Sequence, residues 1–368
     1  MGEYKDLLKK LLDERARGPT VIGGMIPHPD PQVVRDSIGF IDENLGDLND
    51  FPATNLAVSY IARKLSDWMF HSYYPGMATS GGSEANILAE LLARAEGARK
   101  VAAFETAHYS VWKAADILGL KKVVLPVEEG YKPRLDLLDE TVDDETLLVL
   151  TVGTTETGFI DPVVEASRIA CSNGGIVHID GAFAGVIQSY LNPIKIPGKL
   201  DDCIKTYTVD LHKIPEAPAP SGFLLASDSD VLDKLYYKAD YIPSGRQFGL
   251  LGTRPGWTVI AGALSLARIE DKGGIGRIAE LLLDSSKRIA EDLEDYGYTT
   301  PHKVEAPVLC LLHNEINNVV NNLSRAGYSV YRCMNGRGIR LAVTPWLIRE
   351  YGVEGVVELL GEAAETTF

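Results

Sequence analysis

Short apolar, β-branched runs alternate along this chain with amphipathic helical stretches, and this alternation constrains the fold more than any other feature. The runs lie near residues 101–104, 123–126, 147–152, 176–180, 206–209 and 222–226. Helical patterns lie near 3–15, 55–70, 84–96, 109–119, 162–173 and 257–268. A repeated strand–helix–strand pattern produces parallel strands covered by helices. The sequence therefore predicts an α/β fold, with a large domain built on a mostly parallel, doubly wound sheet.

Length and composition agree with this fold class. A chain of 368 residues with 45% apolar and 24% charged residues is globular and supports one large and one smaller domain. We expect an N-terminal helical segment over 1–54, a large domain over 55–275 and a small C-terminal α+β domain over 276–368. A break at Gly273-Gly274 before a long helix near 278–293 marks the second boundary.

Charge and cysteine usage limit the possible partners and location. The formal net charge of -15 argues against a nucleic-acid or anionic membrane surface, and no apolar run is long enough to span a bilayer. The N-terminus has no signal-peptide core. The cysteines show neither CxxC spacing nor histidine clustering, which predicts reduced thiols, no metal site and a cytoplasmic location. These cysteines are Cys171, Cys203, Cys310 and Cys333.

A lysine follows one of the predicted strands and is a candidate for covalent chemistry. Lys213 comes after the run over 206–209 and before a proline-rich stretch over 215–220, so we expect it just past a strand end. Open α/β sheets bind ligands at that edge. A lysine near apolar walls can lose its proton and form a Schiff base, with His212 beside it as a proton carrier. The alternative is a surface lysine in a loop.

An aspartate ends the neighbouring predicted strand. Asp180 follows the buried run over 176–179, where a carboxylate is costly unless it pairs with a cation. A protonated pyridine nitrogen is such a cation, and the small residues Gly181 and Ala182 leave room for a flat ring. The alternative is an aspartate that caps the next helix.

A glycine-containing segment opens a helix over 84–96. In Ser80-Gly81-Gly82-Ser83 the backbone N–H groups can approach a phosphate, which the helix dipole also favours. The segment has neither the dinucleotide GxGxxG spacing nor the GK[ST] of a P-loop, so one small phosphate group fits best. Plain N-capping by Ser83 is the alternative. Together, a phosphate cup, a carboxylate and a lysine are what pyridoxal 5'-phosphate (PLP) needs from a protein.

With these segments, the chain resembles the group II PLP-dependent amino acid decarboxylases, most closely the archaeal L-tyrosine/L-aspartate decarboxylases. The resemblance extends from about 44–54 to 251–256 and weakens toward the C-terminus. It is carried by Ser80-Gly-Gly-Ser-Glu-Ala-Asn86, Ala107-His108, Val152-Gly-Thr-Thr155 with Gly158 and Asp161-Pro162, His178-Ile-Asp180, and Asp210-Leu-His-Lys213. It implies the fold type I PLP-dependent transferase fold and a homodimer with shared active sites.

The resemblance also implies roles for individual residues. Lys213 would form the Schiff base, and Asp180 would bind the pyridine nitrogen. His108 and Ala182 would lie on opposite faces of the ring. The remaining cofactor contacts implied are Gly82, Ser83, Thr155, Asp210 and His212, with Gly252 and Thr253 contributed by the second subunit.

Further residues belong to the substrate side. By the same resemblance, Thr54 and Asn55 would line the substrate side. Arg340 on a predicted strand would clamp the substrate carboxylate, since a guanidinium matches it bidentately. Tyr241, in a loop with Pro243 and Gly245, would return a proton to Cα.

One segment departs from the family pattern. Ile214-Pro215-Glu216 follows the lysine, where the family carries an aromatic residue or methionine followed by glycine. Pro215 fixes φ and removes a donor, so the loop must take another path. Glu216 would discourage an acidic substrate if it faced the pocket.

The leading hypothesis is a PLP-dependent carboxy-lyase that converts an L-amino acid, with tyrosine or aspartate implied by the resemblance, to its amine and CO2. One alternative is another reaction on the same cofactor, either carbon–carbon cleavage or sulfur transfer with Cys203 as the nearest candidate thiol. The other is a PLP-fold scaffold without catalysis.

Overall fold

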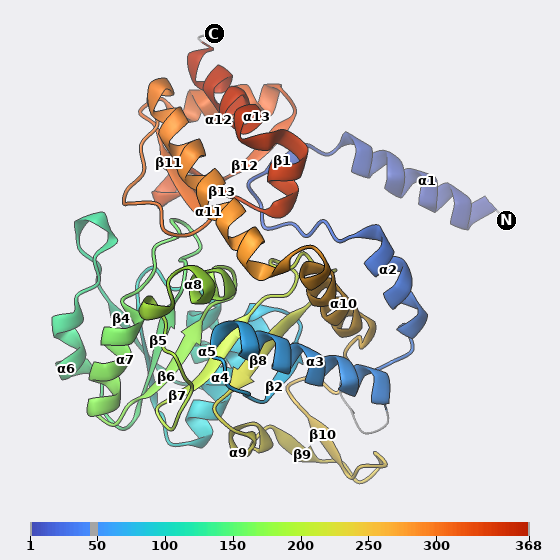
Figure 1. Cartoon of the computed structure of the whole chain (residues 1–368), viewed down its shortest axis with the longest axis vertical. Helices are drawn as coiled ribbons and strands as arrows, with labels where there is room; N and C mark the ends of the chain where they lie inside the picture. The colour runs from blue at the N-terminus through green and yellow to red at the C-terminus, as the bar shows by residue number, and fades with distance from the viewer. Residues whose placement is uncertain (1, 45–50, 367–368) are drawn as a thin grey trace.

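The computed structural model describes residues 2–44 and 51–366. Within them the chain forms a seven-stranded sheet, a four-stranded sheet and a two-stranded hairpin. Figure 1 shows the large sheet in the body of the molecule and the smaller sheet above it, joined by the long helix α11 (Gly274–Asp292). Of the segment 44–54 that carries part of the family resemblance, residues 45–50 lie outside the described residues.

The large sheet has the strand order β2-β8-β7-β6-β5-β3-β4. Strands β3 to β7 run parallel to one another, while β8 is antiparallel to both β7 and β2. This confirms the mostly parallel sheet. The strands are β2 (Gly76–Thr79), β3 (Lys100–Phe104), β4 (Lys121–Leu125), β5 (Thr146–Thr151), β6 (Ile176–Asp180), β7 (Ile204–Val209) and β8 (Gly222–Ala226).

Helices cover both faces of this sheet. In β3, Val101 and Ala103 pack in a cluster with α5, whereas Ala102 and Phe104 belong to the main core on the opposite face. Such two-sided burial explains why these strands read as continuous apolar runs. The helices of this part are α3 (Pro52–Met69), α4 (Gly82–Ala95), α5 (Tyr109–Leu118), α6 (Leu138–Thr141), α7 (Val163–Ser172), α8 (Gly185–Leu191), α9 (Ser229–Asp233) and α10 (Trp257–Asp271).

The smaller sheet combines the two ends of the chain. Its order is β1-β12-β13-β11, and β1 (Thr20–Ile22) pairs in parallel with β12 (Tyr328–Cys333). The sequence did not predict β1, because three residues are too few for a periodic signal. The other strands are β11 (Val308–Leu312) and β13 (Gly338–Ala342). The domain boundaries at 54/55 and 275/276 stay predictions.

The remaining elements complete the chain. Helices α12 (Ile316–Arg325) and α13 (Pro345–Glu365) pack on each other beside the smaller sheet, and α1 (Gly2–Arg17) and α2 (Pro31–Ser37) precede the large domain. Strands β9 (Tyr236–Lys238) and β10 (Arg246–Phe248) form a hairpin. The 3-10 turns are η1 (Ile38–Phe40), η2 (Glu129–Tyr131), η3 (Leu135–Leu137), η4 (Pro193–Lys195), η5 (Leu293–Tyr296) and η6 (Met334–Gly336). No helix of the described part is long and apolar enough to cross a membrane.

The prediction of isolated reduced thiols is wrong. Cys171 is bonded to Cys203 and Cys310 to Cys333, with Cα atoms 5.7 and 6.0 Å apart. The first bond joins the last turn of α7 to the start of β7, and the second joins the two strands that flank β13. Sequence separations of 32 and 23 residues hid these contacts, because only the fold brings the cysteines together.

Removing either disulfide is expected to destabilise the protein. The bonds close loops of 32 and 23 residues, which by loop-closure entropy stabilise the folded state by about 3 to 4 kcal/mol each. The variants Cys171→Ala/Cys203→Ala and Cys310→Ala/Cys333→Ala, unfolded in denaturant without reductant, measure this. Wild-type stability in either variant would contradict the expectation.

Candidate active site

A cavity of about 350 Å³ lies at the edge of the large sheet where β5, β6 and β7 end. Strands and helix N-termini from distant parts of the chain meet there, as expected for an open α/β sheet. Among the residues named from the sequence, the cavity is lined by Gly82, Ser83, His108, Thr155, Asp180, Ala182, Asp210, His212, Lys213 and Arg340.

Lys213 lies on the loop directly after β7. Its Nζ is 2.9 Å from Oδ2 of Asp210, whose side chain is almost fully buried. His212 points its Nδ1 at the carbonyl oxygen of Ser221, at 2.7 Å. A carbonyl only accepts, so Nδ1 donates and Nε2 is left without a proton in the neutral ring. Nε2 lies 3.7 Å from Oδ2 of Asp210.

Asp180 is fixed by two donors at the end of β6. Its Oδ1 accepts from the N–H of Ala182 at 3.1 Å, and its Oδ2 accepts from Nδ2 of Asn86 at 2.9 Å. Asn86 is buried, one helical turn inside α4. A carboxylate that keeps a fixed orientation in the cavity suits a cationic ring nitrogen.

Asn86 uses both of its functional groups. Its Nδ2 also donates to Ser110 Oγ at 2.9 Å, and its Oδ1 lies 3.1 Å from Nε2 of His178. Burial lowers the pKa of His178 to about 4, so the ring is neutral. Because Oδ1 only accepts, Nε2 of His178 carries the proton and Nδ1 accepts from Thr206 Oγ1 at 2.8 Å. The network behind Asp180 is therefore fully hydrogen-bonded.

The same network reaches His108. Ser110 Oγ, which accepts from Asn86, lies 2.8 Å from Nδ1 of His108, and the Ser110 N–H also points at Nδ1. Nδ1 therefore accepts and the proton sits on Nε2. Burial, the largest cause, lowers the pKa of His108, as do Lys213 and Arg340, while Asp180 and Asp210 oppose the shift. A neutral imidazole is suited to stacking on a flat ring.

The phosphate cup forms at the N-terminus of α4. Gly81 has a φ of 114°, which favours glycine, and α4 begins at Gly82 with first-turn N–H groups that have no intrahelical acceptor. A Cβ on Gly82 would lie 3.1 Å from Cβ of Ala182 and 3.2 Å from Oδ2 of Asp210. The close approach of the backbone here requires glycine.

Arg340 also lines the cavity and comes from β13 of the smaller sheet. It is 7% exposed, its Nε donates to the carbonyl oxygen of Thr155, and burial lowers its pKa. Its guanidinium carbon is 5.7 Å from the Tyr331 ring. A desolvated guanidinium at the cavity wall is placed to meet a carboxylate.

Other residues named from the sequence do not line this cavity. Thr54 is buried, and its N–H donates to Oε2 of Glu43 at 2.8 Å, while Asn55 is exposed on α3. Gly252 and Thr253 are exposed in the loop before α10. Tyr241, 89% exposed, sits between β9 and β10, in a hairpin that extends from the body in Figure 1. Their predicted roles stay predictions.

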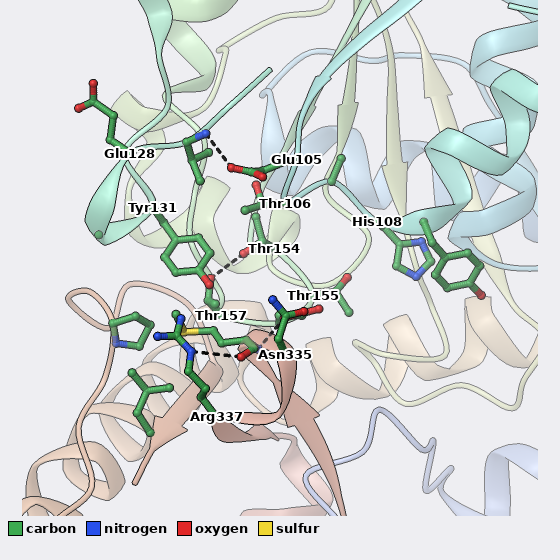
Figure 2. A pocket seen from close by; sticks show the side chains of 18 of the residues that line it. Glu105, Thr106, His108, Glu128, Tyr131, Thr154, Thr155, Thr157, Asn335 and Arg337 are labelled. Carbon is green, nitrogen blue, oxygen red and sulfur yellow. Dashed lines mark hydrogen bonds between the residues drawn. The ribbon is translucent and has the colours of Figure 1, made fainter. Parts of the chain in front are cut away.

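A second and larger chamber, of about 790 Å³, adjoins the cavity and shares His108, Tyr109 and Thr155 with it. Figure 2 shows Glu105 and Tyr131 on one side, with Asn335 and Arg337 of the smaller domain below them. Burial, followed by the charges of Glu156 and Glu105, raises the pKa of Tyr131, while Arg337 lowers it.

Two carboxylates of this chamber form no ion pair with a described residue, although the charge of Glu156 acts to raise the pKa of Arg340. Glu105 accepts from the Val127 N–H at 3.0 Å, and Glu156 accepts from the Met334 N–H at 2.8 Å. Neither forms an ion pair with any residue of the described part. Arg337 is the one arginine, and no lysine is found, among the described residues that line the chamber. The chamber is acidic and has aromatic walls.

The fold and the site define a PLP enzyme of fold type I. The Aminotransferase class-V family model matches residues 74–190. Two relatives are a probable L-tyrosine/L-aspartate decarboxylase of Methanoculleus marisnigri, 30% identical over 92% of this chain and 91% of the relative, and a probable L-aspartate decarboxylase of Archaeoglobus fulgidus, 29% identical over 90% and 91%. The chain belongs to this family of PLP-dependent decarboxylases and is a carboxy-lyase.

Solved structures agree on the fold. Glutamate decarboxylase of Lactobacillus brevis superposes with a TM-score of 0.84 at 15% identity, covering 100% of this chain and 94% of that one. Sphingosine-1-phosphate lyase of Burkholderia pseudomallei superposes with a TM-score of 0.83 at 18% identity, covering 98% and 90%. The two enzymes are named for different reactions, so the fold alone does not choose between these reactions.

The residues of the cavity fit PLP. The glycine cradle at α4 leaves space that a Cβ would fill, and Asp210 Oδ1 is buried without a hydrogen-bond partner in the described chain. An anion site, a fixed carboxylate and a lysine amine face one space. PLP would be held by Gly82 and Ser83 at its phosphate, by Asp180 at its ring nitrogen and by Lys213 at its aldehyde.

Asn86 and His178 lie within motifs that were recognised in the sequence, but no role was predicted for either residue. The available signal was an asparagine in an otherwise apolar helix face, four residues after Gly82. Its partners come from β6, β7 and α5, which no local pattern brings together.

Asn86→Ala is expected to weaken cofactor binding about tenfold, because losing a hydrogen bond to a charged group costs about 1.5–3 kcal/mol. An absorbance titration of the apoprotein with PLP measures the dissociation constant. Ser110→Ala is the matched control, since it removes the branch to His108 and keeps the bond to Asp180. Equal dissociation constants for Asn86→Ala and wild type would refute the role of Asn86.

Proposed function

We propose that this protein decarboxylates an L-amino acid, tyrosine or aspartate, to its amine and CO2, with Lys213 holding the cofactor as a Schiff base. The single observation that carries the proposal is the meeting of Lys213, Asp180 and the Gly82 cradle in one cavity. The names of the relatives support the two substrates.

The residues divide the chemistry among themselves. Bound PLP supplies an electron sink for the carbon that loses CO2. Asp180, held by Asn86 and Ala182, keeps the proton on the ring nitrogen. Arg340 orients the substrate carboxylate, and His212, which lines the same cavity as Lys213, accepts or returns a proton.

A homodimer and a cytoplasmic location belong to the same proposal, although the two disulfides remove the argument from reduced thiols for that location. Gly252, Thr253 and Tyr241 lie outside the cavity of their own chain, and Tyr241 is 89% exposed on a hairpin. A second copy that brought these residues to the cavity would complete the phosphate contacts and supply the proton for Cα. Thr54 is buried, so its part on the substrate side would be to position the neighbouring backbone.

Between the two substrates, the chamber next to the cavity favours tyrosine. Glu105 and Glu156, both exposed at the chamber wall, would repel the side-chain carboxylate of aspartate, whereas a phenol donates a hydrogen bond to either of them. Tyr109, Trp112 and Tyr131 offer aromatic contacts.

The sulfur-transfer alternative lacks its thiol. Cys203 is bonded to Cys171, and the described part of the chain contains no free cysteine. Carbon–carbon cleavage and an inactive scaffold remain as outcomes of the experiment below.

The test compares wild type with Lys213→Ala. We expect wild type with PLP to show a visible absorbance band that the variant lacks, and to form an amine from one of the twenty amino acids. A missing band would refute the cofactor role of Lys213. A band without any amine would refute decarboxylation and favour cleavage or a scaffold.

Substrate preference is expected to follow the acidic chamber. Tyrosine should have a kcat/KM at least about fivefold above aspartate, because one unfavourable charge contact costs on the order of 1 kcal/mol. Glu105→Gln and Glu156→Gln should narrow this ratio by improving turnover of aspartate. A better rate with aspartate in wild type would overturn the choice of tyrosine.

A further inference from the structure

The loop that carries Lys213 separates two cavities. Asp210, His212 and Lys213 line the cofactor cavity. Ile214, Pro215 and Glu216 line another cavity, of about 390 Å³. Glu216 therefore faces away from the substrate, and its carboxylate does not select against acidic amino acids.

Glu216 instead contacts the smaller domain. It is 8% exposed, and its Oε1 accepts from the backbone N–H of Trp346 at 3.0 Å. Its Oε2 lies 3.8 Å from a guanidinium nitrogen of Arg349. Trp346 is in the first turn of α13, where N–H groups have no intrahelical acceptor and a carboxylate is favoured. Glu216 thus joins the lysine loop to the start of α13.

The start of α13 is close in sequence to Arg340. β13, which carries Arg340, ends at Ala342 and leads through Val343 and Thr344 into α13. The Trp346 ring stacks on His28, with centroids 3.9 Å apart. A contact that fixes Trp346 therefore limits where β13 places Arg340.

The backbone conformation and the burial of Glu216 are both energetically unfavourable. Its φ of 61° is one that side chains rarely adopt. Burial raises its pKa to about 7, against the hydrogen bond from Trp346 and the charges of Arg349 and Lys272. His28, Asp30 and Arg268 are the other ionisable groups around this cavity. Because its pKa is raised, the folded protein loses stability as the pH rises from the ordinary pKa of a glutamate toward 7.

We propose that Glu216 is a positioning residue that fixes Arg340 relative to Lys213 through its hydrogen bond to the Trp346 N–H. The lysine loop and the smaller domain are then held together. The substrate therefore meets Arg340 at its carboxylate and Lys213 at its amine, with a set separation between the two residues. The role of Arg340 in this inference rests on the proposed function.

The test uses a pair of substitutions of similar size. Glu216→Gln keeps an acceptor for the Trp346 N–H, whereas Glu216→Met fills the same space without one. We expect Glu216→Met to raise KM for the amino acid at least fivefold while the PLP dissociation constant stays within twofold. Glu216→Gln should restore KM to within twofold of wild type.

The substitution Arg340→Ala tests whether Glu216 changes KM through Arg340. If Glu216 acts through Arg340, the double variant Glu216→Met/Arg340→Ala should have the KM of Arg340→Ala alone. Additive effects, or an unchanged KM in Glu216→Met, would overturn the proposal.

A measurement independent of turnover separates this inference from the proposed function. Hydrogen exchange at the Trp346 amide should accelerate in Glu216→Met and not in Glu216→Gln. If wild type forms no amine, the proposed function fails, but the exchange measurement still tests the role of Glu216. Unchanged exchange at the Trp346 amide in Glu216→Met would overturn the coupling between Glu216 and the start of α13. Should Glu216→Met not fold, Glu216→Ala takes its place in each comparison.

Discussion

The hydrogen bond from Asn86 to Asp180 is the interaction on which the site depends. A carboxylate buried at the end of a central strand is costly unless donors surround it, and Asn86 Nδ2 and the Ala182 N–H supply them. Asn86 and the phosphate cradle lie on the same helix, one turn apart, or about 5.4 Å along its axis. α4 therefore sets the spacing between the two ends of the cofactor.

Much of the fold and site follows from the sequence, because strand ends in a parallel sheet share one edge. Lys213 and Asp180 were predicted at such ends and the glycine segment at the start of a helix, and the structure places all three in one cavity. The helix and strand pattern of the large domain was likewise readable from apolar runs that are buried on both faces.

What the sequence did not reveal depends on contacts between distant segments. The partners of Asn86 come from three elements, and both disulfides close loops whose ends meet only in the fold. The direction of Glu216 is decided by the backbone path after Pro215, which no periodicity encodes. Tyr241, Gly252 and Thr253 lie on the surface of a single chain, so their predicted roles would require a second copy.

The pairing of β1 with β12 builds the smaller sheet from segments near both ends of the chain. Thr20 lies opposite Tyr328, so one edge of this sheet is closed by a strand synthesised long before its partner. Such a non-local contact carries a loop-closure cost, and β1 can pair only after β12 has been synthesised. During synthesis the large domain can complete its own sheet first, while Arg340 reaches the cavity only after the C-terminal segment has docked. A competent site therefore exists only once the C-terminal segment has been synthesised and has docked.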